Sequence, residues 1–327
     1  MQFIDFVAGC EAQQLKIADT PMSGLTSNQV LVKVAAFGIN RADLLQRAGK
    51  YPAPAGESPI LGLEVAGQVT EVPAGLTTRF KVGDKVFGLV AGGAYAEYVA
   101  VEASHLLPLP QSLNYVQGAA VAECFLTAYQ SMFVEYALQP HHKVLIHAGA
   151  SGVGLAAIQL AKRRGCEVAV TASSAEKLAV CKQLGADILV NYREQDFVEV
   201  LKPTGFDLVI DFVAGDYVNR NLALLNRDGT IIQLAMMGGR YVEKFDMALM
   251  LLKRANLKAS TLRNRSNVYK ARLTEAFERD CWQQLQTQQF VPVIDSVYPV
   301  SDIARAHYQM EHNLNCGKIV CYWSDGT

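Results

Sequence analysis

An α/β fold with a doubly wound parallel sheet and a second, β-rich domain is predicted from three observations. Residues 143–262 alternate short apolar runs with helix-like segments, a rhythm typical of parallel sheets with crossover helices. The first third carries β-branched runs separated by Gly and Pro, which favours a small irregular barrel. A glycine-rich turn follows the first apolar run of the alternating region. These features predict a dinucleotide-binding domain over 119–262 and a barrel domain formed by 1–118 and 263–327.

The barrel domain is predicted from both ends of the chain. The strands expected in the first part are 30–36, 64–72 and 85–90, with another beginning within 92–101. From Asn114 the β-rich pattern gives way to a helical one, and 119–132 is typical of one long helix that enters the second domain. After Leu262 we expect a helix over 267–288, a strand over 291–298, a helix over 302–311 and a strand over 317–322. These last elements should return to complete the barrel.

The alternating region predicts the parallel sheet. The expected strands are 143–147, 167–172, 188–191, 206–213, 229–236 and 257–262, and the expected helices are 155–164, 175–184 and 217–225. No low-complexity linker separates the two domains, so we expect them to share a cleft. A cofactor bound at the carboxyl ends of the parallel strands would face this expected cleft.

The glycine turn is the strongest chemical signal. Gly152, Gly154 and Ala157 fit the pattern G-x-G-x-x-G/A, in which small residues permit a tight turn and a close approach of the backbone to a pyrophosphate. The turn lies between an apolar run and a helix-like segment, the context that a Rossmann motif requires. The helix N-terminus then supplies an anion site. We predict that this turn, with Ala150, Ser151 and Val153, binds a dinucleotide.

The end of the next strand indicates which dinucleotide. An NAD site would place an acid there to accept from the ribose 2′-hydroxyl, but 172–177 reads Ala-Ser-Ser-Ala-Glu-Lys. Ser173 and Lys177 suit a 2′-phosphate instead, and Glu176 can face solvent on the opening helical turn. We therefore predict NADPH. Ser173 can also be read as a simple helix N-cap, and the two roles can coexist.

Composition excludes several classes of function. The chain has 327 residues, 50% hydrophobic and 19% charged, with a formal net charge of −1, which gives no footprint for nucleic acid. The seven cysteines form no C-x-x-C pair, which favours reduced thiols over a disulfide framework or a zinc clamp. The N-terminus does not resemble a signal peptide, and no apolar stretch is long enough to span a bilayer. We expect a cytoplasmic protein.

Several motifs together resemble one family. They are 38–52 (Gly-Ile-Asn-Arg-Ala-Asp-Leu-Leu-Gln-Arg-Ala-Gly-Lys-Tyr-Pro), 62–67, 83–86, 126–128, 146–154, 191–192, 237–239, 298–300 and 315–320. With them the chain resembles, nearly end to end, the quinone oxidoreductase or zeta-crystallin family of medium-chain dehydrogenase/reductases. The closest similarity is to the tumour-suppressor-inducible quinone oxidoreductase branch. The resemblance implies a GroES-like barrel as the catalytic domain beside the Rossmann domain.

The resemblance also implies an enzyme without metal. Zinc-dependent relatives carry a Cys in the segment of Asn40 and a His in the segment of Leu63, and neither ligand is present. Residues 87–115 contain no Cys, so the structural zinc lobe is absent too. Two departures from the wider family are Ser151, where a Gly-Gly pair is usual, and Ala122, where a Pro is usual.

Asn40 and Tyr51 are the catalytic residues that the resemblance implies. Asn40 can donate a hydrogen bond to an acceptor carbonyl or to the ribose, and Tyr51 offers a flat face and a hydroxyl. The plainer readings are a turn residue for Asn40 and a packed loop aromatic for Tyr51. Asp43 is expected to fix the Asn40 loop rather than transfer a proton.

Further cofactor contacts come from the same resemblance. Tyr192 and Lys177 resemble adenosine-phosphate contacts, and Asn315 and Lys318 resemble a C-terminal cofactor clamp. Met237, Gly238 and Arg263 are expected near the nicotinamide ribose. Thr127 either bonds the nicotinamide side or bonds the preceding helical turn. His147, on the first strand's end, is more typical of a satisfied core residue than of a cofactor contact.

The predicted function is zinc-independent, NADPH-dependent reduction of small soluble quinones in the cleft between the domains. One alternative keeps the fold and makes the chain an enoyl or alkenal reductase. A second alternative, from another class, is an NADPH-binding RNA-binding or structural crystallin-like protein, which the near-neutral charge disfavours. The resemblance implies a homodimer, in which the exposed edge of 257–262 pairs with its twin.

Overall fold

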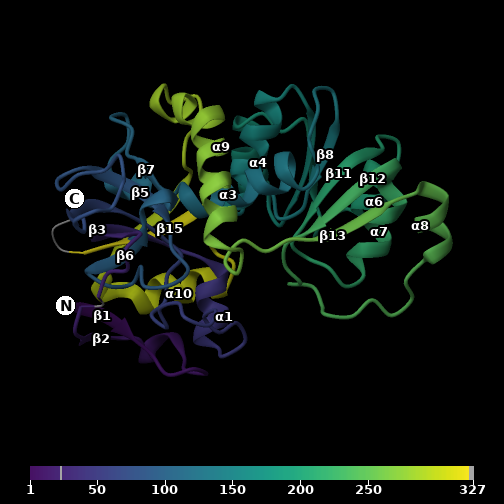
Figure 1. Cartoon of the computed structure of the whole chain (residues 1–327). Coiled ribbons are helices and arrows are strands. Elements are labelled where there is room, and N and C mark those ends of the chain that lie inside the picture. Colours follow the sequence, from purple (N-terminus) through teal and green to yellow (C-terminus); the bar gives the residue numbers. More distant parts are fainter. Residues whose placement is uncertain (23, 324–327) are drawn as a thin grey trace. The chain divides into compact units, whose positions relative to one another are not determined.

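The computed structural model describes residues 1–22 and 24–323 and divides the chain into two compact units. Unit 1 comprises Met1–Leu126 and Leu262–Thr327, and unit 2 comprises Thr127–Thr261. The sequence predicted the first boundary eight residues earlier, at 118/119, and the second one residue later, at 262/263. Figure 1 shows the elements of both units.

Unit 2 is built on a six-stranded parallel sheet. Its strands are β8 (Lys143–Ile146), β9 (Glu167–Ala172), β10 (Ile188–Asn191), β11 (Phe206–Asp211), β12 (Leu225–Gln233) and β13 (Asn256–Ala259). They lie in the order β10-β9-β8-β11-β12-β13, and every neighbouring pair is parallel. The order reverses between β8 and β11. In sheets of this kind, ligands bind outside the carboxyl ends of the strands at such a switch point.

The crossover helices of unit 2 are α4 (Gly152–Arg163), α5 (Ala175–Gln183), α6 (Phe197–Leu201), α7 (Tyr217–Leu224) and α8 (Met247–Lys253). Right-handed crossovers place α4 and α5 on one face of the sheet, and α6, α7 and α8 on the other. The second face is sealed by an apolar cluster that includes Leu145, Phe197, Phe206 and Leu222. Burial of this cluster holds the strand ends at fixed positions for a ligand.

Unit 1 contains an irregular barrel-like sheet. Its strands are β3 (Gln29–Ile39), β4 (Glu64–Glu71), β5 (Lys85–Leu89), β6 (Tyr98–Glu102), β7 (Leu106–Pro108), β14 (Ile294–Pro299) and β15 (Lys318–Tyr322). The order is β14-β15-β3-β4-β5-β7, and β6 also pairs with β3. β15 runs antiparallel to β3, so the C-terminal strands complete the sheet begun by the N-terminal ones (Figure 1). This part of the prediction is confirmed.

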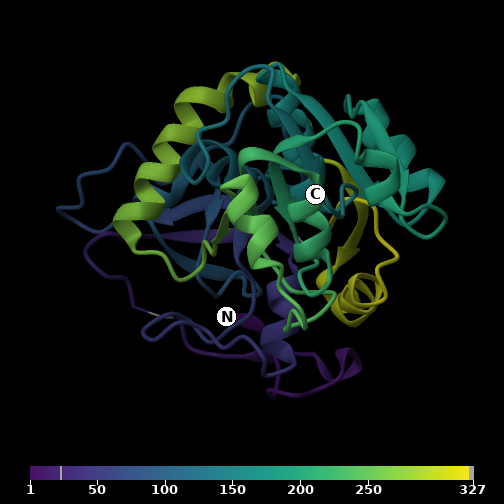
Figure 2. The same ribbon diagram turned by 90° about the vertical axis from the view of Figure 1, so that its right-hand side faces the viewer.

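Helices and a hairpin surround the barrel of unit 1. The helices are α1 (Arg41–Arg47), α2 (Tyr115–Gly118), α3 (Ala122–Tyr129, which continues into unit 2), α9 (Asn267–Gln286) and α10 (Ile303–Glu311). Figure 2 shows α9 along its length. β1 (Gln2–Asp5) and β2 (Lys16–Asp19) form a separate antiparallel pair. No helix in 1–22 or 24–323 combines the length and the apolar character needed to cross a membrane.

Several predicted elements differ in the structure. The long helix expected over 119–132 is instead α3 followed by a π-helical turn, Gln130–Val134. The Ser131 hydroxyl donates to the Thr127 carbonyl at 2.8 Å, a local bond of the kind that disturbs regular helices. Residues 92–97 form no strand, because β6 begins only at Tyr98. The short elements β1, β2, α1, α6 and α8 were not predicted.

Candidate functional site

The glycine turn lies where a dinucleotide cradle requires it. Helix α4 begins at Gly152, directly after β8 and at the switch point of the sheet. The Ser151 hydroxyl accepts from the Gly154 N–H at 3.0 Å and caps the helix. A Cβ at Gly154 would lie 2.6 Å from the carbonyl oxygens of both Ala148 and Gly149. Only glycine permits this turn, which leaves the N-terminus of α4 open to an anion.

The two adjacent serines after β9, Ser173 and Ser174, have different roles. Ser174, not Ser173, is the N-cap of α5, and its hydroxyl accepts from the Lys177 N–H at 3.3 Å. The alternative reading of Ser173 as the N-cap is therefore wrong by one residue. The Ser173 side chain makes no hydrogen bond within the described parts of the chain. It remains available to a ligand at the strand end.

The other predicted cofactor residues of unit 2 lie after strands of the sheet, at the starts of helices and in α3. Tyr192 and Met237 are exposed and follow β10 and β12, while Gly238 donates its N–H to the Val213 carbonyl at 2.7 Å. These residues follow the carboxyl ends of two strands of one sheet, β10 and β12. Ala150, Val153 and Lys177 lie at the starts of α4 and α5, and Thr127 is buried in α3.

His147 belongs to a closed network inside unit 2. Its Nδ1 lies 2.9 Å from the Thr171 hydroxyl, and its Nε2 lies 2.7 Å from Oδ1 of Asn221. Asn221 donates in turn to Asp211 at 3.0 Å. Burial lowers the pKa of His147, so the ring is held neutral. Both nitrogens are occupied, which confirms the reading of His147 as a satisfied core residue.

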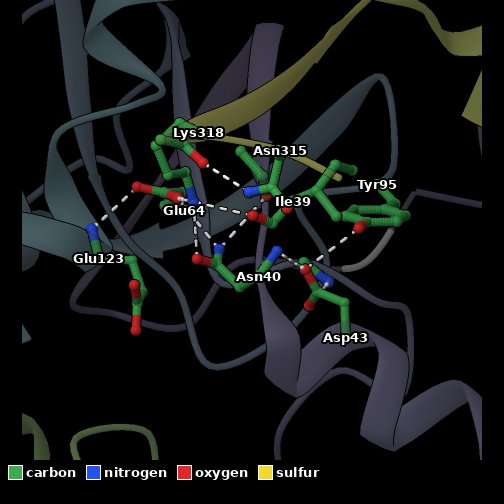
Figure 3. Close-up of polar contacts among 11 residues, drawn as sticks. Ile39, Asn40, Asp43, Glu64, Tyr95, Glu123, Asn315 and Lys318 are labelled. Carbon is green, nitrogen blue, oxygen red and sulfur yellow. Dashed lines mark hydrogen bonds and ion pairs between the residues drawn. The ribbon is translucent and has the colours of Figure 1, made fainter. Parts of the chain in front are cut away.

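Unit 1 holds a buried ion pair beside Asn40 (Figure 3). Lys318 Nζ lies 2.6 Å from Glu64 Oε1, 2.7 Å from Asn40 Oδ1 and 2.9 Å from the Ile39 carbonyl oxygen. The other Glu64 oxygen accepts from the Glu123 backbone N–H at 2.9 Å. Burial alone would lower the pKa of Lys318, but the neighbouring carboxylate of Glu64 outweighs it and raises that pKa. The ammonium is therefore kept protonated, and all three of its hydrogens are donated.

This cluster changes the roles expected of two residues. All three ammonium hydrogens of Lys318 are donated within unit 1 and the residue is 3% exposed, so its ammonium holds no free hydrogen for the cofactor contact predicted for it. Asn40 donates to Glu64 Oε1 at 3.0 Å and to the Gly38 carbonyl at 3.4 Å. Both amide hydrogens are thus used, which leaves no donor for an acceptor carbonyl. The structure gives Asn40 a positioning role.

A second chain of hydrogen bonds continues from Asn40 into the core. Asp43 accepts from the Asn40 N–H at 2.8 Å and from the Tyr95 hydroxyl at 3.1 Å. His307 lies 3.0 Å from that hydroxyl and 3.1 Å from Arg47 Nη1. Because Arg47 can only donate, His307 accepts through Nδ1 and donates through Nε2 to Tyr95. Asp43 therefore fixes the Asn40 loop, as expected.

Burial strongly shifts the pKa values of Asp43 and His307 in this network of hydrogen bonds. Burial raises the pKa of Asp43 to about 6, against the opposing hydrogen bonds from Asn40 and Tyr95. Burial, together with the charge of Arg47, lowers the pKa of His307 to about 3. Neither group contacts solvent.

We expect His307 to make the fold sensitive to acid. In the unfolded chain a histidine binds its proton near pH 6.5, whereas in the fold His307 stays neutral down to about pH 3. Its contribution to stability is present above pH 6.5 and is lost as the pH falls. At pH 5 the loss should be about 2 kcal/mol relative to pH 7.5. Urea unfolding at both pH values measures it.

The matched variant is His307→Gln, whose amide can accept from Arg47 and donate to Tyr95 without titrating. The loss between pH 7.5 and 5 should be smaller in this variant by the same amount. Burial also lowers the pKa of His105, to about 4, and raises that of Asp43, to about 6; these two groups act in opposite directions as the pH falls, and both are common to the two proteins. An equal loss of stability in both proteins would show that His307 does not carry the effect.

Tyr51 and Arg263 lie together in unit 1. The guanidinium carbon of Arg263 is 5.4 Å from the centre of the Tyr51 ring. Its Nε donates to the Ala91 carbonyl at 2.7 Å and its Nη2 to Gln46 Oε1 at 2.7 Å. Burial raises the pKa of Tyr51, and Arg263 opposes that shift. Arg263, predicted beside the nicotinamide ribose, thus lies against Tyr51, and the predicted ribose contact stays a prediction.

Asn315, also predicted as a cofactor contact, donates its amide to the Gly317 carbonyl at 2.7 Å.

Within the described parts of the chain, no three His, Cys, Asp or Glu side chains lie close enough to hold a metal ion.

The sequence did not reveal the partners of these residues. Glu64, Tyr95, His307 and Arg47 are distant in sequence, and each looks like an ordinary residue of a strand, loop or helix. The one available signal was the presence of charged residues within apolar runs, such as Glu64 before Val-Ala and Lys318 before Ile-Val. Such charges are rarely buried unless they are paired.

Comparison with known proteins shows which families the two parts of the chain match. Residues 26–111 match the alcohol dehydrogenase GroES-like domain, and residues 152–279 match the zinc-binding dehydrogenase family. The quinone oxidoreductase of Escherichia coli, solved with NADPH, superposes with a TM-score of 0.88 at 28% identity, covering 98% of this chain and 100% of that one. The chain belongs to the medium-chain dehydrogenase/reductase superfamily. The α/β fold with a parallel Rossmann sheet and a GroES-like domain is thereby confirmed.

Two other superfamily relatives are informative. A mycobacterial protein solved with NADPH has a TM-score of 0.87 at 28% identity and covers 98% of this chain and 99% of its own. The polyketide synthase GfsB of Streptomyces halstedii is 41% identical over 152 residues. That match covers 46% of this chain but only 3% of the synthase. The curated relative is thus much longer than the segment it shares.

Proposed function

We propose that this chain is an NADPH-dependent oxidoreductase of the quinone oxidoreductase family that reduces small quinones without zinc. The observation that carries the proposal is the glycine turn at the switch point of the sheet, in a chain similar over nearly its whole length to a quinone oxidoreductase solved with NADPH. When bound, NADPH supplies the reducing equivalents. The chain's own residues bind and orient the reactants.

The residues of unit 2 fit this cofactor. The N-terminus of α4 and the close-packed Gly154 turn suit a pyrophosphate. At the end of β9, Ser173, whose hydroxyl has no hydrogen-bond partner among the described residues, stands in place of an acid and suits a 2′-phosphate. Tyr192 follows β10, and Met237 and Gly238 follow β12, in the same parallel sheet. This donor set supports NADPH over NADH.

The residues of unit 1 argue for chemistry without a metal. Glu64 Oε1 and Asn40 Oδ1 are oxygen atoms that a cation could use, and both already bind the Lys318 ammonium. A divalent metal ion there would meet a buried positive charge a few ångströms away, which opposes its binding. Tyr51, which combines a flat face with a hydroxyl, supports the recognition of a planar acceptor.

The test is a titration of NADPH and NADH into the purified chain, with and without 1,4-benzoquinone, following cofactor fluorescence and oxidation in parallel. We expect selective binding of NADPH and oxidation that depends on the quinone. Tyr51→Phe retains the ring, whereas Tyr51→Ala removes it. If the ring orients the acceptor, Ala should raise the KM for quinone more than Phe does.

The contradicting results are specific. Tight NADPH binding without quinone turnover, combined with faster saturation of an α,β-unsaturated aldehyde, would favour an alkenal reductase. Failure to bind either dinucleotide would overturn the reading of the glycine turn. Submicromolar, salt-sensitive binding of RNA would favour the alternative class of function.

We also propose a homodimer formed through β13. This strand is at the edge of the sheet of unit 2, and its four residues are exposed. An open strand edge presents unpaired backbone groups that a second copy can satisfy. Light scattering of the purified chain measures the mass, and a monomer at micromolar concentration would contradict the proposal.

A further inference from the structure

Arg263 is buried in unit 1 with part of its hydrogen-bonding capacity unused. It is 7% exposed, and its Nε and Nη2 are held by Ala91 and Gln46. Gln46 is itself fixed, because its amide nitrogen donates to the Pro59 carbonyl at 2.8 Å. Nη1, however, is buried and has no partner among the described residues. An unsatisfied buried donor on a charged group is costly, so a bound oxygen at this nitrogen would be strongly favoured.

A second buried cation lies within electrostatic reach of Arg263. Lys270, in the first turn of α9, is 4% exposed. Within the described parts of the chain, its ammonium forms no hydrogen bond or ion pair. The charges of Glu57 and Glu102 reach it, but the charge of Arg263 also acts on it and opposes its protonation. The region therefore holds two buried positive charges that no contacting carboxylate neutralises.

Tyr51 determines how a ligand could approach. Its ring lies against the Arg263 guanidinium and is only partly buried. It belongs to the segment 48–63, which contains no helix or strand. The guanidinium is anchored by Ala91 and Gln46, and the Tyr51 ring beside it is partly exposed to solvent, so we take the Tyr51 side as the route for a ligand. An aromatic ring at this position also gives a planar ligand a surface to stack on.

We propose that Arg263 and Lys270 form a subsite in unit 1 for an anionic oxygen of a planar ligand, such as a carboxylate or sulfonate substituent, with Tyr51 packing against the ring of that ligand. Arg263 Nη1 donates a charge-assisted hydrogen bond to the anion, and Lys270 contributes its charge. That the ligand is the electron acceptor rests on the proposed function. The anion subsite itself stands on the geometry of unit 1.

The experiment compares two non-reducible ligands of the same shape. Naphthalene-2-sulfonate carries the anion, and naphthalene-2-sulfonamide is its neutral counterpart. Isothermal titration calorimetry on the full chain should show the sulfonate binding ~10-fold more tightly than the sulfonamide. In Arg263→Gln this preference should fall below ~2-fold, and in Lys270→Met it should fall ~3-fold.

Arg265→Gln is the matched control. Arg265 is only two positions after Arg263 in the chain, but its guanidinium stacks on the ring of Tyr269 rather than on Tyr51. It should keep the preference of the wild type. Thermal unfolding checks that each variant folds, and Lys270→Met tests the subsite independently if Arg263→Gln does not fold. Equal affinity for both ligands in the wild type, or an equal loss in the control, would overturn the subsite. A sulfonate preference without any quinone turnover would support the subsite and overturn only the proposed quinone reduction.

Discussion

Replacement of Lys318 by methionine is expected to lower the free energy of unfolding of unit 1 by about 3–5 kcal/mol. The reason is that the substitution leaves Glu64, the partner of Lys318, without its ion pair. Glu64 is 0% exposed, and without the ammonium its carboxylate would be buried with no positive charge in contact. Asn40 Oδ1 would lose its donor at the same time. Urea unfolding followed by tryptophan fluorescence measures the effect in unit 1, which contains both tryptophans, Trp282 and Trp323.

Two controls separate the ion pair from general damage. In the double variant Glu64→Gln/Lys318→Met no charge remains buried, so more than half of the loss should be recovered. The exposed pair Arg254–Asp228 is the surface counterpart, and Arg254→Met should cost far less stability than Lys318→Met. A loss in Lys318→Met no larger than in Arg254→Met would show that burial does not set the energetics of the pair.

The second large effect is expected from Gly154→Ala. The added Cβ would lie 2.6 Å from two backbone carbonyl oxygens, those of Ala148 and Gly149, and backbone atoms cannot move aside as a flexible side chain can. The turn before α4 must therefore open, which displaces the N–H groups proposed to bind the pyrophosphate. We expect NADPH affinity to fall at least ~30-fold, about 2 kcal/mol, in a fluorescence titration.

Gly24→Ala is the matched control, because a Cβ there would meet no atom within 4 Å. It should bind NADPH as the wild type does. Circular dichroism of Gly154→Ala should remain close to that of the wild type, since the clash is confined to one turn. Undiminished affinity in a folded Gly154→Ala variant would mean that the cofactor does not depend on this turn.

The features that the sequence predicted well are local ones. The strand 167–172 was predicted with the bounds it has in the structure, and the helix after Gly152 was predicted to within three residues. A β-branched run and a glycine turn depend on neighbours in the chain, so their signals survive without tertiary information. The long helix over 119–132 failed because a hydroxyl bond and a π-helical turn interrupt an otherwise continuous apolar pattern.

The candidate site was predicted only in part for the same reason. The turn residues of unit 2 are where the motif placed them. Lys318 and Arg263 were predicted to contact the cofactor, and the sequence did not show that they lie against Glu64 and Tyr51, residues more than 200 positions earlier in the chain. Only the pairing of β15 with β3 brings Lys318 beside Glu64 and Asn40.

By itself, the sequence determined the two-domain α/β architecture, the position of the glycine turn and the absence of an acid at the end of β9, because periodicity and turn chemistry depend on adjacent residues. The tertiary structure alone decided which charges are buried and what they contact. The cost of burying Lys318, Asn40 and Arg263 depends on partners that the folded chain brings close, and that cost decides whether each side chain is free to meet a ligand or already committed within the protein.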